Sequence, residues 1–391
     1  SMPFIAVSFS NHDHSNVLHE KAQSVLSHSD GEVSLISRLL CIHPPSQTHK
    51  RVYSIFQWLQ RIYLFLLILL LISAIFLLFH QASIFLLIYI SSLIDFVLLL
   101  WWNESSVHER FPQCLLEATS GVGSVKRRES IETTQRLTFT ILFVLSLLYI
   151  LLFVLSSIFR SSSSPPPLLH PYIGMTLLTI SLSVVLFSTV AASTLFITRL
   201  SLLSSEFHTH SDDFLTDSNT FQACVLKHYC LIHTKIINAF STVRRSFSLW
   251  LFLHILLDFV HFHLFLDNLL RLFNSSSSLP SDPVQSLLFV SRDLLLPLFI
   301  PLTRFIFSFA SIYRLQMASK RFTHHLASLL CTQNKMMNDQ TYFICMTYSS
   351  HLSSSCNHHL RLFGLILNSS FLFKISLSSL ILLYLIHVRD I

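Results

Sequence analysis

The sequence has few charged residues, and this scarcity excludes an ordinary soluble protein. Lys, Arg, Asp and Glu make up only 12% of the 391 residues, whereas hydrophobic residues make up 52%. Soluble domains carry about twice that share of charge. The net charge of +6 calls for no nucleic-acid partner, because basic residues that flank membrane spans meet anionic lipid headgroups. Membrane lipid is the partner that this composition predicts.

Long apolar runs occupy much of the chain. Seven runs of about 18 or more mostly apolar residues are long enough to cross a bilayer as helices. These runs, numbered as spans one to seven, are 62–79, 84–102, 138–159, 172–198, 249–273, 286–313 and 363–388. The sequence therefore predicts an all-α polytopic membrane protein with seven transmembrane helices.

Basic residues are scarce on one side of these spans. Nearly all precede span one or lie between spans two and three, four and five, or six and seven; the alternate side has only Arg160, Arg271 and Arg389. Basic connections stay in the cytosol. We therefore expect a cytosolic N-terminus and, with an odd number of spans, an extracellular C-terminus. A G-protein-coupled receptor has the opposite orientation.

Cysteine is absent from the connections predicted to lie outside the cell. Disulfides form outside and free thiols survive in the cytosol, so this absence agrees with the orientation. The cysteine spacing matches no zinc-ligand pattern, and we expect free thiols, no metal and no cofactor. The seven cysteines are Cys41, Cys114, Cys224, Cys230, Cys331, Cys345 and Cys356.

The chain also shows no cleavable signal peptide, so span one is expected to direct insertion into the plasma membrane. Residues 1–56 form a cytosolic segment and residues 57–391 the transmembrane domain. The outer connections are short, whereas the inner ones are long and predict cytosolic anchor helices at 220–248 and 314–362, the latter broken at 338–340. Apolar faces on such helices need partner subunits to bury them.

The topology and the end of the chain carry a family resemblance. Tyr384 follows Leu383, and five residues separate it from the pair Asp390-Ile391. Insect gustatory and odorant receptors end in Thr-Tyr, five mostly apolar residues and Gln-Phe, so the tyrosine and the spacing match while the other positions differ. With seven spans, a cytosolic N-terminus and long inner helices, the chain resembles these receptors and their gustatory-receptor-like relatives.

The resemblance implies a ligand-gated cation channel that forms a homo- or hetero-tetramer, with the last helix, 363–391, lining a shared pore. It also implies that a small-molecule ligand binds among the outer halves of the other spans. In a helical last span, apolar and acidic side chains share one face, and Asp390 would form an acidic ring that attracts cations. The alternative is that Asp390 does not line a pore and simply lies at the membrane–water interface, at the end of its helix. The candidate pore-lining residues are Leu380, Leu383, Tyr384, His387, Asp390 and Ile391.

Ionisable residues inside the spans need partners, because each costs a few kcal/mol at the bilayer centre. Spans five and six run antiparallel, and counting depth along each brings Asp258 level with Arg304 and Asp267 level with Arg292. We expect two ion pairs that lock these helices together. A ligand pocket in the outer half is the other interpretation, and its candidate residues are Tyr89, Tyr149, His261, Asp267 and Arg292.

Two other classes of protein remain as alternatives. His254, Asp258 and His261 share a helical face, which would suit a seven-span zinc hydrolase similar to the progestin and adiponectin receptors. Such an enzyme needs histidines on another span, and span seven offers only His387, so we expect no enzyme. A G-protein-coupled receptor is disfavoured because no Asp-Arg-Tyr follows span three and no Asn-Pro-x-x-Tyr lies in span seven. A secondary transporter usually repeats broken helices, and no matching break occurs here.

Overall fold

The structure is a bundle of long helices. The computed structural model describes residues 124–162, 170–217, 222–274, 296–332, 338–355, 360–362 and 365–367, together with 90–91, 93–99 and the single residues 65, 290, 374, 378 and 381. Residues 90–91 and 93–99 are helical and belong to span two; they are called the span-two segment below. All further structural statements concern these described residues.

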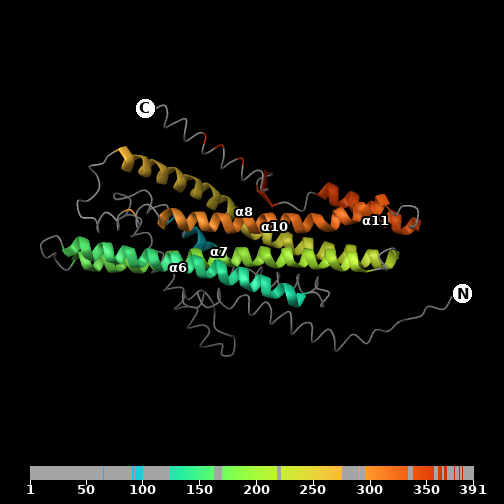
Figure 1. Cartoon of the computed structure of the whole chain (residues 1–391), viewed down its shortest axis with the longest axis horizontal. Coiled ribbons are helices and arrows are strands. Elements are labelled where there is room, and N and C mark those ends of the chain that lie inside the picture. Colours follow the sequence, from blue (N-terminus) through green and yellow to red (C-terminus); the bar gives the residue numbers. More distant parts are fainter. Residues whose placement is uncertain are drawn as a thin grey trace.

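Helices α6, α7 and α10 run along the long axis of the molecule, and α8 crosses them at an angle (Figure 1). The short helix α11 lies against α10 and α8 at one end of the bundle. Helix bounds are α6 Ser124–Ser162, α7 His170–Thr216, α8 Ala223–Asn274, α10 Leu296–Thr332 and α11 Asp339–Ser355. Two short strands, β1 Leu360–Leu362 and β2 Leu365–Leu367, pair antiparallel.

The long helices are longer than a bilayer is thick. The 47 residues of α7 extend about 70 Å, whereas the hydrocarbon core measures about 30 Å. Three described helices are long and apolar enough to cross a membrane, over Gln135–Leu155, Leu182–Thr216 and Leu298–Cys331. These stretches overlap spans three, four and six, and the second and third run 18 residues beyond the predicted ends at 198 and 313. Span five lies within α8, and spans one and seven fall almost entirely outside the described residues.

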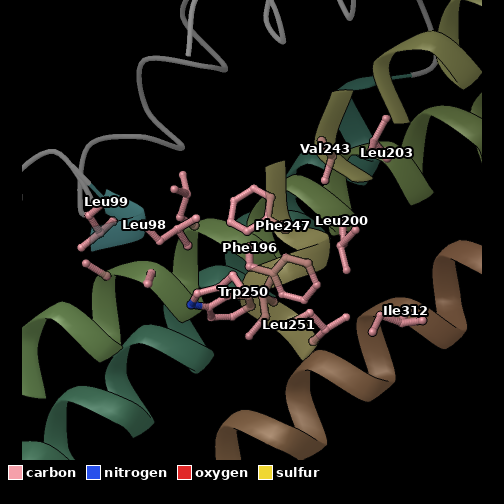
Figure 2. Close-up of a cluster of buried hydrophobic side chains, with 14 of the residues drawn as sticks. Leu98, Leu99, Phe196, Leu200, Leu203, Val243, Phe247, Trp250, Leu251 and Ile312 are labelled. Carbon is pink, nitrogen blue, oxygen red and sulfur yellow. The ribbon is translucent and has the colours of Figure 1, made fainter. Parts of the chain in front are cut away.

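The main core surrounds α7. Residues 188–200 of α7 are all buried, as expected for a helix that is apolar around its circumference. The small residues Ala191, Ala192 and Ser193 allow neighbouring helices to approach closely. In Figure 2, Phe196 of α7 meets Phe247 and Trp250 of α8, with ring centroids 5.2 and 5.1 Å apart.

A second core holds the other end of the bundle together, at the end where the inner helices extend beyond the spans. α7, α8, α10 and α11 all contribute to it. The second core consists of Phe214, Leu226, Cys230, Phe322, Leu326 and Cys345. Its two cysteines are free thiols, as are the exposed Cys224 and Cys331. Burial raises the pKa of the Cys230 thiol to about 12 and that of Cys345 to about 11, so both stay protonated and unreactive at neutral pH.

The anchor helix predicted at 314–362 is shorter than expected. α10 runs through to Thr332 and α11 ends at Ser355, while 360–362 and 365–367 are strands and not helix. The sequence Leu-Arg-Leu, Phe-Gly, Leu-Ile-Leu explains the difference, because a two-residue connection with glycine between apolar residues is typical of a hairpin. By contrast, α8 is one uninterrupted helix of 52 residues, so the inner helix at 220–248 continues directly into span five.

Candidate functional site

A buried polar network ties the span-two segment to α7, α8 and α10 inside the main core. Seven side chains from these four helices contact one another through hydrogen bonds and ion pairs. All but Asp258 are buried, and the Asp258 side chain is only 14% exposed. The network consists of Ser91, Asp95, Thr189, Trp250, His254, Asp258 and Arg304.

Asp95 is the centre of the network. Its side chain is fully buried, and both carboxylate oxygens accept hydrogen bonds. Oδ1 accepts from the indole Nε1 of Trp250 at 2.7 Å, and Oδ2 accepts from the hydroxyl of Thr189 at 2.7 Å. His254 places Nε2 at 2.7 Å from Oδ1. These contacts satisfy a carboxylate that would otherwise be very costly to bury in the membrane.

Arg304 of α10 connects the two acidic residues. Its Nη2 forms an ion pair with Oδ1 of Asp258 on α8, and its Nη1 lies 3.7 Å from Oδ2 of Asp95. Nη1 also donates a hydrogen bond to the hydroxyl of Ser91 at 2.9 Å. One guanidinium therefore bridges the span-two segment and α8, a geometry to which its planar set of five donors is suited.

His254 joins α8 to the span-two segment through both ring nitrogens. Nε2 faces Asp95, and Nδ1 lies 3.2 Å from the hydroxyl of Ser91. The edge of the ring packs against Trp250, with centroids 4.7 Å apart. The imidazole is therefore enclosed by Asp95, Ser91 and Trp250.

The four helices bring the network together at one depth. Asp95 lies seven residues before the end of span two, Thr189 and Arg304 nine residues before the ends of spans four and six, and His254 five residues after the start of span five. Each of these ends is the one predicted to face the cytosol. The network thus lies in the half of the spans that the sequence predicts to be nearer the cytosol, one to three helical turns from their predicted ends.

The structure brings Asp258 and Arg304 together as the depth count predicted. For the other predicted pair, the side chains of Asp267 and Arg292 lie outside the described part of the structure. The same holds for Tyr89 and for all predicted pore-lining residues, Leu380, Leu383, Tyr384, His387, Asp390 and Ile391. Of the remaining ligand-binding candidates, Tyr149 on α6 and His261 on α8 are buried within the bundle.

Two of the three residues proposed for a zinc enzyme contact residues of other helices. His254 contacts Asp95 and Ser91, while Asp258 contacts Arg304. Within the described ranges, no group of three or more His, Cys, Asp or Glu side chains could hold a metal ion. The shared face of His254 and Asp258 is therefore accounted for by helix-to-helix contacts.

Sequence reasoning identified Asp95 as an ionisable residue in span two but gave it no partner. It also missed Ser91, Thr189 and Trp250, because hydroxyl and indole groups are common in membrane helices. Depth in the membrane could have predicted the contact between Asp95 and His254. The two residues lie at similar distances, counted in residues, from the predicted cytosolic ends of spans two and five.

Polar contacts also surround the second core. The hydroxyl of Tyr348 on α11 lies 3.0 Å from Nδ1 of His233 and 3.0 Å from the hydroxyl of Thr234, both on α8. Burial raises the pKa of Tyr348. Nearby, Tyr229 donates to the Asp213 carbonyl and to the Asp217 carboxylate at 3.2 Å each, and burial raises its pKa to about 12.

The comparison with solved structures gives matches, whereas the comparisons of sequence do not. No protein-family model and no curated protein matches the sequence. The structure, however, is similar to that of the insect olfactory receptor OR5 from Machilis hrabei in complex with eugenol, with a TM-score of 0.62 and 14% sequence identity. The match covers 92% of this chain and 99% of that receptor.

A second structure of the same olfactory receptor matches with a TM-score of 0.57 and 12% identity, covering 92% of this chain and 98% of that one. Because both matches extend over nearly the whole length of each chain, they concern the complete helical arrangement and not one motif. The fold is that of a membrane protein related in architecture to the insect chemoreceptors that the sequence resembles. The chain has the insect olfactory receptor fold.

Proposed function

We propose that this protein is a chemoreceptor-like, ligand-gated cation channel of the plasma membrane. The observation that carries the proposal is the match to an insect olfactory receptor over 92% of this chain and 99% of the receptor. The predicted topology and the position of Tyr384 near the end of the sequence support it independently.

The same comparison supports a small organic molecule as the ligand. The matched receptor binds eugenol, a small and largely apolar organic molecule. We infer that this chain binds a small organic ligand between the outer parts of its spans, where Tyr89, His261, Asp267 and Arg292 are candidates. Tyr149 is buried in the main core and would reach a ligand only from the bundle interior.

Assembly into a tetramer is supported by apolar side chains that one subunit leaves exposed. On α11, Tyr342, Phe343 and Met346 are 36%, 70% and 48% exposed and lie within four residues of one another. This short helix is otherwise rich in serine and threonine, and it lies beyond the candidate membrane spans. Since an aqueous surface seldom exposes such a patch, we infer that partner subunits cover it.

The pore is proposed to form from the part of the last predicted span that follows β2, residues 368–391, because β2 occupies the start of the helix that the sequence predicted at 363–391. Four copies of Asp390 would form a ring of negative charge that concentrates cations. Leu383 or Ile391 would form an apolar constriction in this pore. Asp390 therefore controls permeation in this proposal, whereas an Asp390 that faces the membrane interface would not.

The experiment records currents from cells that express the full chain, with eugenol as the first probe in a panel of small organic compounds. Asp390→Asn should lower the single-channel conductance without loss of surface expression, because the ring loses its charge. Asp390→Lys should suppress cation current much further. Asp339→Asn, at the start of α11, removes a carboxylate away from the predicted mouth and should leave conductance unchanged. Equal conductance in all four proteins would remove Asp390 from the pore.

A further inference from the structure

Helix α10 contains no acidic residue, and its basic residues are Arg304, Arg314, Lys320 and Arg321. Two of them are engaged inside the subunit, since Arg304 pairs with Asp258 and Arg321 pairs with Asp212. Arg314 and Lys320 are exposed, and neither forms an ion pair with another described residue. These two cations are therefore open to a negative partner from outside the subunit.

The exposed side of α10 is otherwise apolar. Phe299, Leu302, Ile306, Tyr313 and Met317 are all exposed, and their spacing of three, four, seven and four residues places them on one side of the helix. The 18 residues from Phe299 to Met317 extend about 27 Å at 1.5 Å per residue, which is close to the thickness of the hydrocarbon core. This side of α10 is suited to contact acyl chains along its length.

The two exposed cations lie at the inner end of this apolar side. Met317 follows the predicted end of span six at 313 and is 55% exposed. Arg314 lies three residues before Met317 and Lys320 three residues after it, so they flank it by about 60° on either side of the helix. Tyr313, 47% exposed, lies one turn earlier, and tyrosine is common where a membrane meets water. Tyr313, Arg314, Met317 and Lys320 are called the α10 patch below.

We propose that the α10 patch binds one anionic phospholipid of the cytosolic leaflet. The phosphate lies between Arg314 and Lys320, and an acyl chain follows the apolar side of α10 toward Ile306. Such a lipid occupies one place on the protein, which distinguishes it from the general attraction of basic residues to headgroups. The proposal rests on the predicted orientation of span six and not on channel activity.

Both basic side chains can reach a phosphate at the membrane surface. Arg314 is the first residue after the predicted span, and Lys320 lies seven residues beyond residue 313, about 10 Å along the helix. The headgroup region adds about 5–8 Å on each side of the hydrocarbon core. A long lysine side chain bends toward this region. Arg314 therefore approaches the phosphate from the membrane side and Lys320 from the water side.

A second copy of this chain is a less suitable occupant, because the neighbouring helices offer few carboxylates. The acidic residues of α7 beyond span four all have interactions within the folded subunit; they are Glu206, Asp212, Asp213 and Asp217. Helix α8 has no acidic residue before Asp258. An anionic headgroup supplies the charge that these helices do not.

Native mass spectrometry of the full-length protein in detergent tests the proposal, with phosphatidylserine and phosphatidylcholine added in separate titrations. The wild type should bind one phosphatidylserine per subunit more tightly than it binds phosphatidylcholine. Lys320→Gln and Arg314→Gln should each weaken phosphatidylserine binding about fivefold, because each removes one cation near the phosphate. Binding of phosphatidylcholine, which has no net charge, should change little.

Lys227→Gln is the matched control. Lys227 is an exposed lysine on α8 and lies 22 residues, about 33 Å, before the predicted start of span five at 249. Its loss removes the same charge beyond the reach of a headgroup and should leave phosphatidylserine binding unchanged. Met317→Gln should weaken the binding of both lipids, because the apolar contact does not depend on headgroup charge.

Equal binding of the two lipids by the wild type would overturn the proposal. A loss in Lys227→Gln as large as that in Lys320→Gln would also overturn it, since the attraction would then be spread over the whole basic surface. Salt gives a measurement that needs no substitution. Raising NaCl from about 0.1 M to about 0.5 M should reduce the preference of the wild type for phosphatidylserine, and a preference that salt leaves unchanged would contradict a site built on Arg314 and Lys320.

Discussion

At the residue scale, Arg304 joins three functional groups of the network through one guanidinium. It is 3% exposed, contacts Asp258 on α8, and reaches Asp95 and Ser91 in span two. Loss of one member of a buried ion pair leaves an uncompensated charge, which typically costs about 3–5 kcal/mol. The contribution of the Asp258 contact is therefore measurable by substitution.

We predict that Arg304→Gln and Asp258→Asn each reduce the folded yield and the melting temperature in detergent. The double variant should recover part of the loss, because no charge is left unpaired between these two positions. A double-mutant cycle measures the coupling. The control is Arg321 with Asp212, an ion pair at 3.2 Å whose side chains are 41% and 34% exposed; its coupling should stay below about 1 kcal/mol. A double variant no better than either single one would show that Asp258 and Arg304 do not stabilise each other.

At the element scale, α11 is held against α8 and α10 by the second core and by Tyr348. The tyrosine hydroxyl lies 3.0 Å from both His233 and Thr234, and Cys345 is fully buried in the same contact. Cys345 therefore reports on the docking of α11, since a maleimide reaches its thiol only when the helix moves away. Burial, which raises the pKa of this thiol to about 11, slows the reaction further.

We predict that Tyr348→Phe accelerates alkylation of Cys345 about fivefold, because the loss of a hydrogen bond costs about 1 kcal/mol. The control is Tyr342→Phe, which removes a partly exposed hydroxyl from the same helix and should leave the rate unchanged. Mass spectrometry of the labelled peptides gives the rates, with the exposed Cys224 and Cys331 as internal references. Labelling of Cys345 as fast as Cys331 in the wild type would mean that α11 is not docked.

At the scale of the whole molecule, orientation in the membrane decides where the network, the anchor helices and the pore lie. Basic residues gather on one side of the predicted spans, and the cysteines follow the same division. If this orientation is right, the second core and α11 are cytosolic and the polar network lies in the inner half of the bilayer.

We predict that an epitope tag after Ile391 binds antibody on intact cells, whereas a tag before Met2 binds only after permeabilisation. The positive-inside rule gives the physical reason, since cytosolic loops retain Lys and Arg during insertion. Surface immunofluorescence of the two tagged proteins makes the measurement. The reverse pattern would contradict the orientation and, with it, the proposed channel.

The sequence by itself determined the class of protein and the placement of several spans. Hydropathy is a local property, so the runs at 138–159, 172–198 and 286–313 correspond to three helices that are apolar enough to cross a membrane. The uninterrupted path of α8 into span five also follows from continuous helical periodicity, with no proline between Ala223 and Asn274.

Only the tertiary structure decided which polar side chains meet. Depth along a span can be counted from sequence, and this was enough to pair Asp258 with Arg304. The rotation of each helix about its axis and the choice of its neighbours cannot be counted, and these bring Ser91, Asp95 and His254 together. The strands at 360–362 and 365–367 were missed for a related reason: short apolar runs suit helix and strand equally, and pairing between the two segments decides.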